Sequence, residues 1–355
     1  ALAVELKGLA ERGIDGHGRL FISDRAHVVF PYHRLVDEYR EKKPSTGDRI
    51  GTTKRGIGPT YGDKAARVGL RMGDLLDPIF PDLLRARVAA ANLVLAAHGA
   101  PLVDAEAVLV EYQEAIRYLA PFIADTIPLV NGAIKQGRSI LFEGAQGTML
   151  DIDYGTYPFV TSSSATAGGA CTGAGVAPHR IDQVVGVVKG YSTRVGEGPF
   201  PTELKDEMGE LIRKVGHEFG ATTGRPRRCG WFDAVVARYS VMINGIDWWA
   251  MTKLDVLDGV ETIKVCVAYE AEGRTYETVP ANVRVLEKCV PVYQEFPGWQ
   301  TSTRDVKRVE DLPPNALAYV KALVRLTGAP VGMLSFGPQR ERTLRLHHAG
   351  AMITG

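Results

Sequence analysis

Short apolar runs alternate with longer helical patterns along this chain, and that alternation limits the fold more than any other feature. Three stretches have apolar residues at helical spacing and end near proline or glycine: residues 81–98, 105–118 and 314–328. Five apolar runs have the length and composition of buried strands: Ser139–Phe142, Gln183–Lys189, Trp248–Thr252, Ile263–Tyr269 and Val331–Ser335. The pattern predicts an α/β fold, with a mostly parallel central sheet flanked by helices.

The composition is that of an ordinary soluble globular protein. The chain has 355 residues, of which 45% are hydrophobic and 23% charged, and we expect a single domain spanning residues 1–355. A formal net charge of +1 gives no reason to expect a nucleic-acid partner. No apolar run reaches the ~18 residues of a membrane span, so we expect no membrane partner.

The cysteines argue against a zinc site or a disulfide framework, because none of them shows C-x-x-C spacing. We expect a reducing, cytoplasmic location and four buried thiols. The four are Cys171, Cys229, Cys266 and Cys289.

Residues 51–67 combine flexible backbone, hydroxyl donors and positive charge. This is the set of groups that a phosphate monoester needs. The alternative is a solvated basic surface loop. The segment contains Gly51, Gly56, Gly58 and Gly62, with Thr52, Thr53, Lys54, Arg55, Lys64 and Arg67.

Residues 220–230 contain Arg225, Arg227 and Arg228, three arginines within four positions. Such arginines repel one another unless anions lie among them, and guanidinium groups bind carboxylate or phosphate in bidentate fashion. The segment therefore predicts an anion site, with an exposed basic loop as the alternative.

Thr-Lys-Leu-Asp at 252–255 follows an apolar run and resembles the Asn-Lys-x-Asp guanine reader of GTPases. Asp255 would accept the N1–H and 2-amino groups of guanine, while the stem of Lys253 would lie along the ring. Ser335, Phe336 and Gly337 would close the other side of the base with backbone groups.

Two further segments carry polar residues in turn-forming contexts. Gln146 in Glu143–Thr148 can donate and accept at once, which suits a purine edge or developing charge at its O6, although a structural turn explains it equally well. Asp151 and Asp153 could suggest a metal pair, but no histidine or glutamate accompanies them at ligand spacing, so we favour ordered turns.

Together these segments resemble the adenylosuccinate synthetase family over essentially the whole chain. The similarity is carried by Gly-Ile-Gly-Pro-x-Tyr-x-x-Lys-x-x-Arg at 56–67, and by residues 142–148, 191–204, 220–230, 252–259, 297–299 and 335–337. The resemblance implies a P-loop-NTPase-like fold and a GTP-dependent ligase of AMP biosynthesis. In that family GTP phosphorylates O6 of IMP, and the amine of L-aspartate then displaces the phosphate. The products are adenylosuccinate, GDP and phosphate, with Mg²⁺ as cofactor.

The resemblance also implies where each substrate binds and that the protein is a homodimer. Gln146 would support catalysis, Lys64 matches the lysine of the motif, and Arg67 would reach the IMP of the neighbouring subunit. IMP would contact Thr53, Arg67, Gln146, Thr161 and Arg225. Aspartate would contact Ala221, Thr222, Thr223, Gly224, Arg225, Pro226 and Arg227. GTP would contact Arg227, Lys253, Leu254, Asp255, Ser335, Phe336 and Gly337.

The chain departs from the family pattern at its amino-terminal end. It begins at Ala1, and it lacks the family's Gly-Asp-Glu-Gly-Lys-Gly phosphate loop and an early catalytic histidine. We therefore expect that an amino-terminal segment is missing and that this segment holds the general base, the general acid and the Mg²⁺ ligands. Without it, we expect this chain alone to be inactive. The alternative is a non-catalytic nucleotide-binding or dimerisation fragment.

Overall fold

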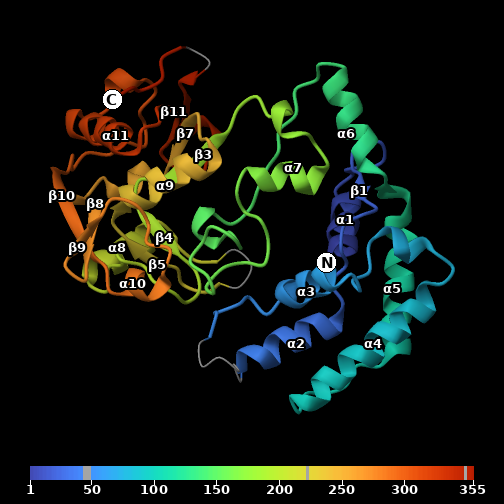
Figure 1. Ribbon diagram of the computed structural model, residues 1–355. Helices are drawn as coiled ribbons and strands as arrows, with labels where there is room; N and C mark the ends of the chain where they lie inside the picture. Colours follow the sequence, from blue (N-terminus) through green and yellow to red (C-terminus); the bar gives the residue numbers. More distant parts are fainter. Residues whose placement is uncertain (43–48, 221–223, 348–349) are drawn as a thin grey trace. The chain divides into compact units, whose positions relative to one another are not determined.

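The computed structural model describes residues 1–42, 49–220, 224–347 and 350–355, and these form two compact units (Figure 1). The first unit comprises residues 1–144, 161–164 and 169–180. The second comprises residues 145–160, 165–168 and 181–355. This grouping does not test the single-domain prediction, because two compact units can belong to one folding domain.

The first unit is mainly helical. A short parallel pair of strands, β1 and β2, joins Ile22 to Ile123 and Ser23 to Ala124. The elements in order are α1 (Leu2–Glu11), β1 (Ile22–Ser23), α2 (Pro31–Lys42), α3 (Ile57–Ala66), η1 (Gly73–Leu76), α4 (Phe80–Ala97), α5 (Ala105–Leu119), η2 (Ala120–Phe122), β2 (Ile123–Ala124), α6 (Thr126–Lys135), α7 (Gly168–Ala174, its first residue in the second unit) and η4 (Pro178–Arg180).

The core of this unit follows from the amphipathic pattern of its longest helix, α4. Phe80, Leu84, Val88 and Leu95 recur at helical spacing and are buried against α2 and α5. Pro81 lacks a backbone N–H, but the first turn of a helix does not use that donor, so α4 begins where the sequence predicts.

The second unit is built on a four-stranded central sheet in the order β12-β11-β7-β3. Strands β3, β7 and β11 run parallel, and β12 pairs antiparallel at the edge. Figure 1 shows these three parallel strands side by side, near α9 and α11. The strands are β3 (Val185–Lys189), β7 (Trp248–Thr252), β11 (Val331–Ser335) and β12 (Thr343–Arg345).

A second four-stranded sheet and short helices complete this unit. Strand β8 pairs with β10, β9 and β6, mostly antiparallel. The remaining elements are η3 (Thr148–Leu150), β4 (Ser192–Arg194), α8 (Glu207–Val215), β5 (Arg228–Gly230), β6 (Phe232–Asp233), α9 (Ala234–Asn244), η5 (Leu254–Leu257), β8 (Thr262–Ala271), β9 (Arg274–Tyr276), α10 (Val283–Glu287), β10 (Val290–Pro297), η6 (Val309–Asp311), α11 (Pro314–Thr327) and η7 (Arg340–Arg342).

The predicted α/β class with a mostly parallel central sheet is confirmed, and one predicted strand is wrong. Residues 139–142 form no strand, and Leu141 is 87% exposed. An apolar run becomes a strand only where another strand accepts its backbone hydrogen bonds, and no described strand pairs with this run. The central sheet ends at β3 instead, where Val187 is 76% exposed.

Candidate functional site

The carboxyl ends of β3, β7 and β11 lie together at one edge of the central sheet. Lys189 is in register with Thr252 across β3 and β7, and Leu334 with Met251 across β11 and β7. In open α/β sheets, ligands bind at this edge. The predicted guanine-reading segment leaves the sheet here, and its backbone turns through Lys253, whose φ of 57° lies in the left-handed region.

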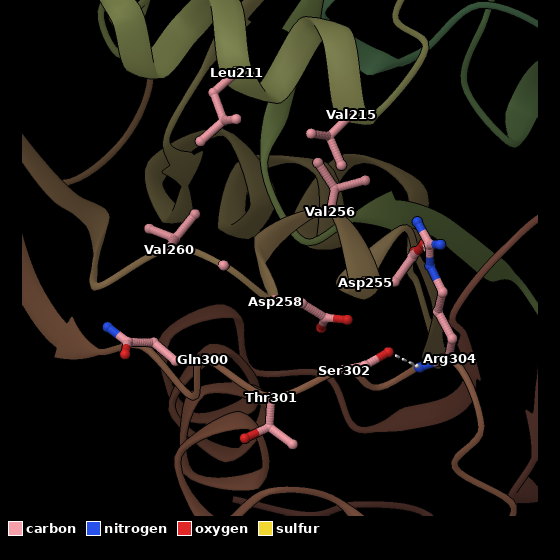
Figure 2. Close-up of a pocket in the computed structure, with 11 residues that line it drawn as sticks. Leu211, Val215, Asp255, Val256, Asp258, Val260, Gln300, Thr301, Ser302 and Arg304 are labelled. Carbon is pink, nitrogen blue, oxygen red and sulfur yellow. Dashed lines mark hydrogen bonds and ion pairs between the residues drawn. The ribbon is translucent and has the colours of Figure 1, made fainter.

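Asp255 lines a cavity of about 380 Å³ just beyond this edge (Figure 2). Figure 2 shows Leu211 and Val215 of α8 on one side and the 300–304 loop on the other. The side chain of Asp255 is only 12% exposed. Among the residues that the structure describes, none donates a hydrogen bond to its buried Oδ1 atom. A buried carboxylate oxygen without a donor among the described residues therefore belongs to a residue that lines the cavity.

The electrostatics of Asp255 match that geometry. Burial raises the pKa of Asp255, and Asp258 raises it further. The guanidinium of Arg304 opposes this rise, with its Nε 3.9 Å from Oδ2 of Asp255. A ligand with two parallel N–H groups would stabilise the charged carboxylate by supplying the missing donors.

The loop opposite Asp255 is held by Asp258, which the sequence analysis did not single out. Its Oδ1 accepts hydrogen bonds from Trp299 Nε1 and Thr303 Oγ1, both at 2.8 Å, and its Oδ2 accepts the Thr303 N–H, also at 2.8 Å. Three bonds to one carboxylate fix the 299–303 backbone, which forms the far wall of the cavity. The sequence offers only the weak signal of a second aspartate three residues after Asp255.

The other residues predicted to bind GTP do not line this cavity. The amine of Lys253 donates to the Gly216 carbonyl at 2.6 Å and to Glu218 at 3.1 Å. Leu254 and Phe336 are fully buried in the core. The Ser335 hydroxyl donates to the Gly337 carbonyl at 3.0 Å, which makes a tight turn after β11.

The three arginines of residues 220–230 do have anions among them, but the anions are glutamates of this chain. Each arginine contacts a different one. The pairs are Arg225 with Glu197 at 3.1 Å, Arg227 with Glu218 at 2.6 Å, and Arg228 with Glu203 at 2.6 Å.

The degree of exposure separates these pairs. Glu218 is fully buried, whereas the side chains of Arg225 and Glu197 are about half exposed, at 46% and 52%. Arg228 binds Glu203 through two nitrogens and also donates to the carbonyls of Gly196 and Gly198. Arg228 is thus a structural residue, and Arg225 is the arginine best placed to exchange its partner for a ligand.

The rest of this segment is partly described. Gly224 lies in the left-handed region, with φ of 63°, and its N–H donates to the Gly220 carbonyl at 2.7 Å. Pro226 pairs with Phe219 in an isolated bridge. Ala221, Thr222 and Thr223, which were predicted to bind aspartate, lie outside the described residues.

Residues 51–67 lie in the first unit, where they lead into α3. Thr53, Lys64 and Arg67 are exposed. Gly56 caps the helix with φ of 79°, and a Cβ at this position would lie 2.8 Å from the Arg34 nitrogen, so only glycine fits. A helix amino terminus attracts anions, which agrees with the predicted phosphate site.

Two acidic residues and a histidine hold this segment, and sequence reasoning did not assign them. The buried Asp37 accepts the Gly56 N–H at 2.9 Å. Nδ1 of the buried His33 accepts the Phe30 N–H at 2.9 Å, so its Nε2–H donates to Asp63 in α3 at 3.0 Å. These bonds fix α3 on α2 and leave the cations of the segment at the surface.

The remaining predicted residues divide between the two units. Thr161 belongs to the first unit, and its hydroxyl lies 3.3 Å from that of Ser163. A Cβ at Gly58 would lie 3.5 Å from Ser162 Oγ, so this turn approaches the start of α3. Gln146 belongs to the second unit, is exposed and has a left-handed φ of 66°. No strand precedes Gln146, contrary to the prediction, because residues 139–142 are not paired.

The interpretation of Asp151 as a turn residue is confirmed. Its carboxylate accepts four backbone N–H bonds, from Asp153, Tyr154, Ala165 and Thr166, at 2.7 to 3.1 Å. Burial alone would raise the pKa of Asp151, but these four bonds outweigh it and the pKa is lowered. The carboxylate therefore ties two loops together.

The described part of the chain shows no group of three His, Cys, Asp or Glu side chains that could hold a metal ion. Within the same ranges, no helix has the length and apolar character needed to cross a membrane. All four cysteines are free thiols, and three are buried as predicted, whereas Cys171 is only half-buried.

The fold and these sites define an α/β protein with a cavity lined by Asp255 and an arginine-rich loop near the carboxyl edge of its central sheet. The adenylosuccinate synthetase family model matches residues 1–344. The chain belongs to the adenylosuccinate synthetase family.

Three relatives illustrate the match. The adenylosuccinate synthetase of Heliobacterium modesticaldum is 54% identical over 98% of this chain and 82% of its own length. That of Pelotomaculum thermopropionicum is 51% identical over 96% of this chain and 80% of its own length. The fully ligated adenylosuccinate synthetase structure from Plasmodium falciparum is 38% identical, with a TM-score of 0.90 over 96% of this chain and 82% of that chain.

The family match also bears on the expectations about the amino-terminal end. The family model matches residues 1–344, and nothing in these comparisons bears out the expectation of a missing amino-terminal segment. The expectation that the chain is inactive alone has no support either, nor does the assignment of Mg²⁺ ligands to such a segment.

Proposed function

We propose that the protein is a GTP-dependent ligase that joins L-aspartate to IMP and releases adenylosuccinate, GDP and phosphate. Membership of the adenylosuccinate synthetase family supports this activity, at about half identity over nearly the whole chain. The same matches do not favour a non-catalytic nucleotide-binding or dimerisation fragment.

One observation of the structure carries the choice of GTP. The nearly buried Asp255 carboxylate lines a cavity and has, among the described residues, no hydrogen-bond donor for its Oδ1 atom. Guanine offers adjacent N1–H and 2-amino donors to such a carboxylate, and adenine offers no matching pair. A buried acceptor without a donor costs about 1–3 kcal/mol, which favours guanine over adenine.

The reaction would proceed in two steps. The γ-phosphoryl group of GTP passes to O6 of IMP, and the aspartate amine then attacks C6 and expels phosphate. Gln146 would hydrogen-bond the purine edge, and Thr53, Thr161 and Arg225 would bind IMP. Residues 221–227 would bind aspartate, and Arg227 with residues 253–255 and 335–337 would bind GTP.

Mg²⁺ would offset the charge of the phosphates when bound. The described residues show no group of three His, Cys, Asp or Glu side chains that could hold a metal ion, and no step of this proposal is assigned to a metal ligand. The motif residue Lys64 would contribute positive charge in the last turn of α3. We propose a cytoplasmic location, as for other soluble biosynthetic enzymes.

We also propose a homodimer in which Arg67 contacts the IMP of the partner subunit. The exposure of Arg67 at the end of α3 leaves it accessible to a partner. Mixing inactive Arg67→Leu and Arg225→Leu subunits tests this, because one site of each mixed dimer then carries neither change. Recovered product formation is expected, and no recovery after proven subunit exchange would contradict shared sites.

The activity itself is tested by supplying the purified protein with IMP, aspartate and either GTP or ATP, with Mg²⁺. Adenylosuccinate should form with GTP and much more slowly with ATP. Nucleotide binding measured by calorimetry should show the same preference for GTP. Equal binding of the two nucleotides, or product formation that prefers ATP, would contradict the proposal.

A further inference from the structure

Glu218 joins several charged and polar side chains of the second unit through one carboxylate. Its carboxylate is fully buried. Donors from four places in the sequence converge on it: Lys189 at 2.9 Å, Tyr191 Oη at 2.5 Å, Arg227 at 2.6 Å and Lys253 at 3.1 Å. They come from the ends of β3 and β7 and from the segment before β5, so one carboxylate joins the ligand edge of the sheet to the arginine-rich loop.

Glu218 also closes the base of that loop through its backbone. Its carbonyl accepts the Arg227 N–H at 2.9 Å, and its N–H donates to the Arg213 carbonyl at 2.9 Å. The next pair, Phe219 and Pro226, forms a bridge, and the Gly220 N–H donates to the Arg225 carbonyl at 2.8 Å. Any displacement of Glu218 must therefore move both the loop and its arginines.

The charge balance of the cluster is unequal. Three cations, Lys189, Arg227 and Lys253, surround one carboxylate, which leaves two positive charges uncompensated within the cluster. Burial alone would raise the pKa of Glu218, but the bonds from Tyr191 and Lys189 and the surrounding charges lower it to about 2. The carboxylate thus stays ionised at neutral pH, and the cluster keeps an excess charge that an anionic ligand can neutralise.

We propose that Glu218 is a positioning residue that fixes Arg227 and Lys253 for GTP and, through the backbone pairs of residues 218–220 with 225–227, holds Arg225 for aspartate. This inference rests on the proposed function, because that function assigns Arg227 and Lys253 to GTP. Glu218 touches no substrate itself. It acts by removing the conformational freedom of two long cationic side chains before the ligand arrives.

The test compares Glu218→Gln with Glu203→Gln. Both changes remove a carboxylate that pairs with an arginine of residues 227–228, but Glu203 contacts neither Arg227 nor Lys253. We expect Glu218→Gln to raise KM for GTP and for aspartate by about tenfold or more, and KM for IMP less, because Arg225 is the only proposed IMP contact in this loop. Glu203→Gln should lower the melting temperature and leave all three KM values near those of the wild type.

A second variant, Tyr191→Phe, covers the case in which Glu218→Gln does not fold. It keeps every charge and nearly all of the side-chain volume, and removes one hydrogen bond to Glu218. We expect a rise of about threefold in KM for GTP. Unchanged KM values for both variants, or equal effects of Glu218→Gln and Glu203→Gln, would overturn the inference. If the wild-type protein neither binds GTP nor forms adenylosuccinate, the proposed function itself has failed.

Discussion

The two cationic segments of this chain are organised in opposite ways. In residues 225–228 each arginine contacts a glutamate of its own unit, and one of these glutamates is fully buried. In residues 51–67 the cations Lys64 and Arg67 are exposed. The buried side chains of His33 and Asp37 instead hydrogen-bond Asp63 and the backbone of Gly56. Two segments of similar composition are therefore ordered differently. Residues 225–228 have their side chains held by glutamates, whereas residues 51–67 have their backbone held and their cationic side chains exposed.

The difference concerns when conformational entropy is lost. A guanidinium held by a buried carboxylate has lost its rotamer freedom during folding, so ligand binding does not have to order it. An exposed lysine or arginine is ordered only when its ligand or partner arrives. We therefore expect substitutions in residues 225–228 to change both ligand affinity and protein stability. In residues 51–67 we expect the largest effects from substitutions that disturb the backbone at the start of α3.

The largest expected effect separates Arg225 from Arg228. Arg225→Leu should raise KM for aspartate by about ten- to a hundredfold, because a charge-assisted pair is worth roughly 1.5–3 kcal/mol. Arg228→Leu should instead lower the melting temperature and leave KM for aspartate unchanged. It removes the partner of Glu203, whose side chain is only 15% exposed. Steady-state kinetics and thermal unfolding measure both. If Arg228→Leu raises KM as much as Arg225→Leu, the division into binding and structural arginines is wrong.

A smaller effect is expected at the glycines that begin α3. Gly56→Ala forces a left-handed residue against the Arg34 backbone at 2.8 Å, and should lower the free energy of unfolding by roughly 1–3 kcal/mol. Gly58→Ala is the matched control, since its Cβ would meet only Ser162 Oγ at 3.5 Å. Denaturant unfolding should show loss for the first change and little change for the second. Equal stabilities would show that the α3 backbone is not preset.

The elements that the sequence predicted best are those with a strong local cause. Strands β7 and β11 match their predicted bounds, and α11 ends at Thr327 because Gly328 adopts the left-handed conformation that closes a helix. Residues 139–142 have the same local pattern as a strand but do not form one. Pairing depends on a neighbour that is distant in the sequence, so a four-residue apolar run cannot decide it.

The candidate site shows the same limit. Asp255 could be predicted because its chemistry follows directly from its place after a strand. Glu218 and Asp258 could not, because their importance lies in partners up to 45 residues away that only the fold brings together. The sequence predicted anions among the three arginines of residues 220–230, but it could not show that glutamates of this chain contact each of them.

The most direct test of the account is the nucleotide preference of Asp255→Asn. The amide replaces one carboxylate acceptor with a donor, which mismatches the 2-amino group of guanine and matches the 2-carbonyl group of xanthine. At fixed concentrations of IMP and aspartate, the wild-type protein should form product faster with GTP than with xanthosine triphosphate. The variant should form product faster with xanthosine triphosphate, by about tenfold or more. If Asp255→Asn still binds and uses GTP better than xanthosine triphosphate, Asp255 does not read the base, and the assignment of GTP to this cavity is contradicted.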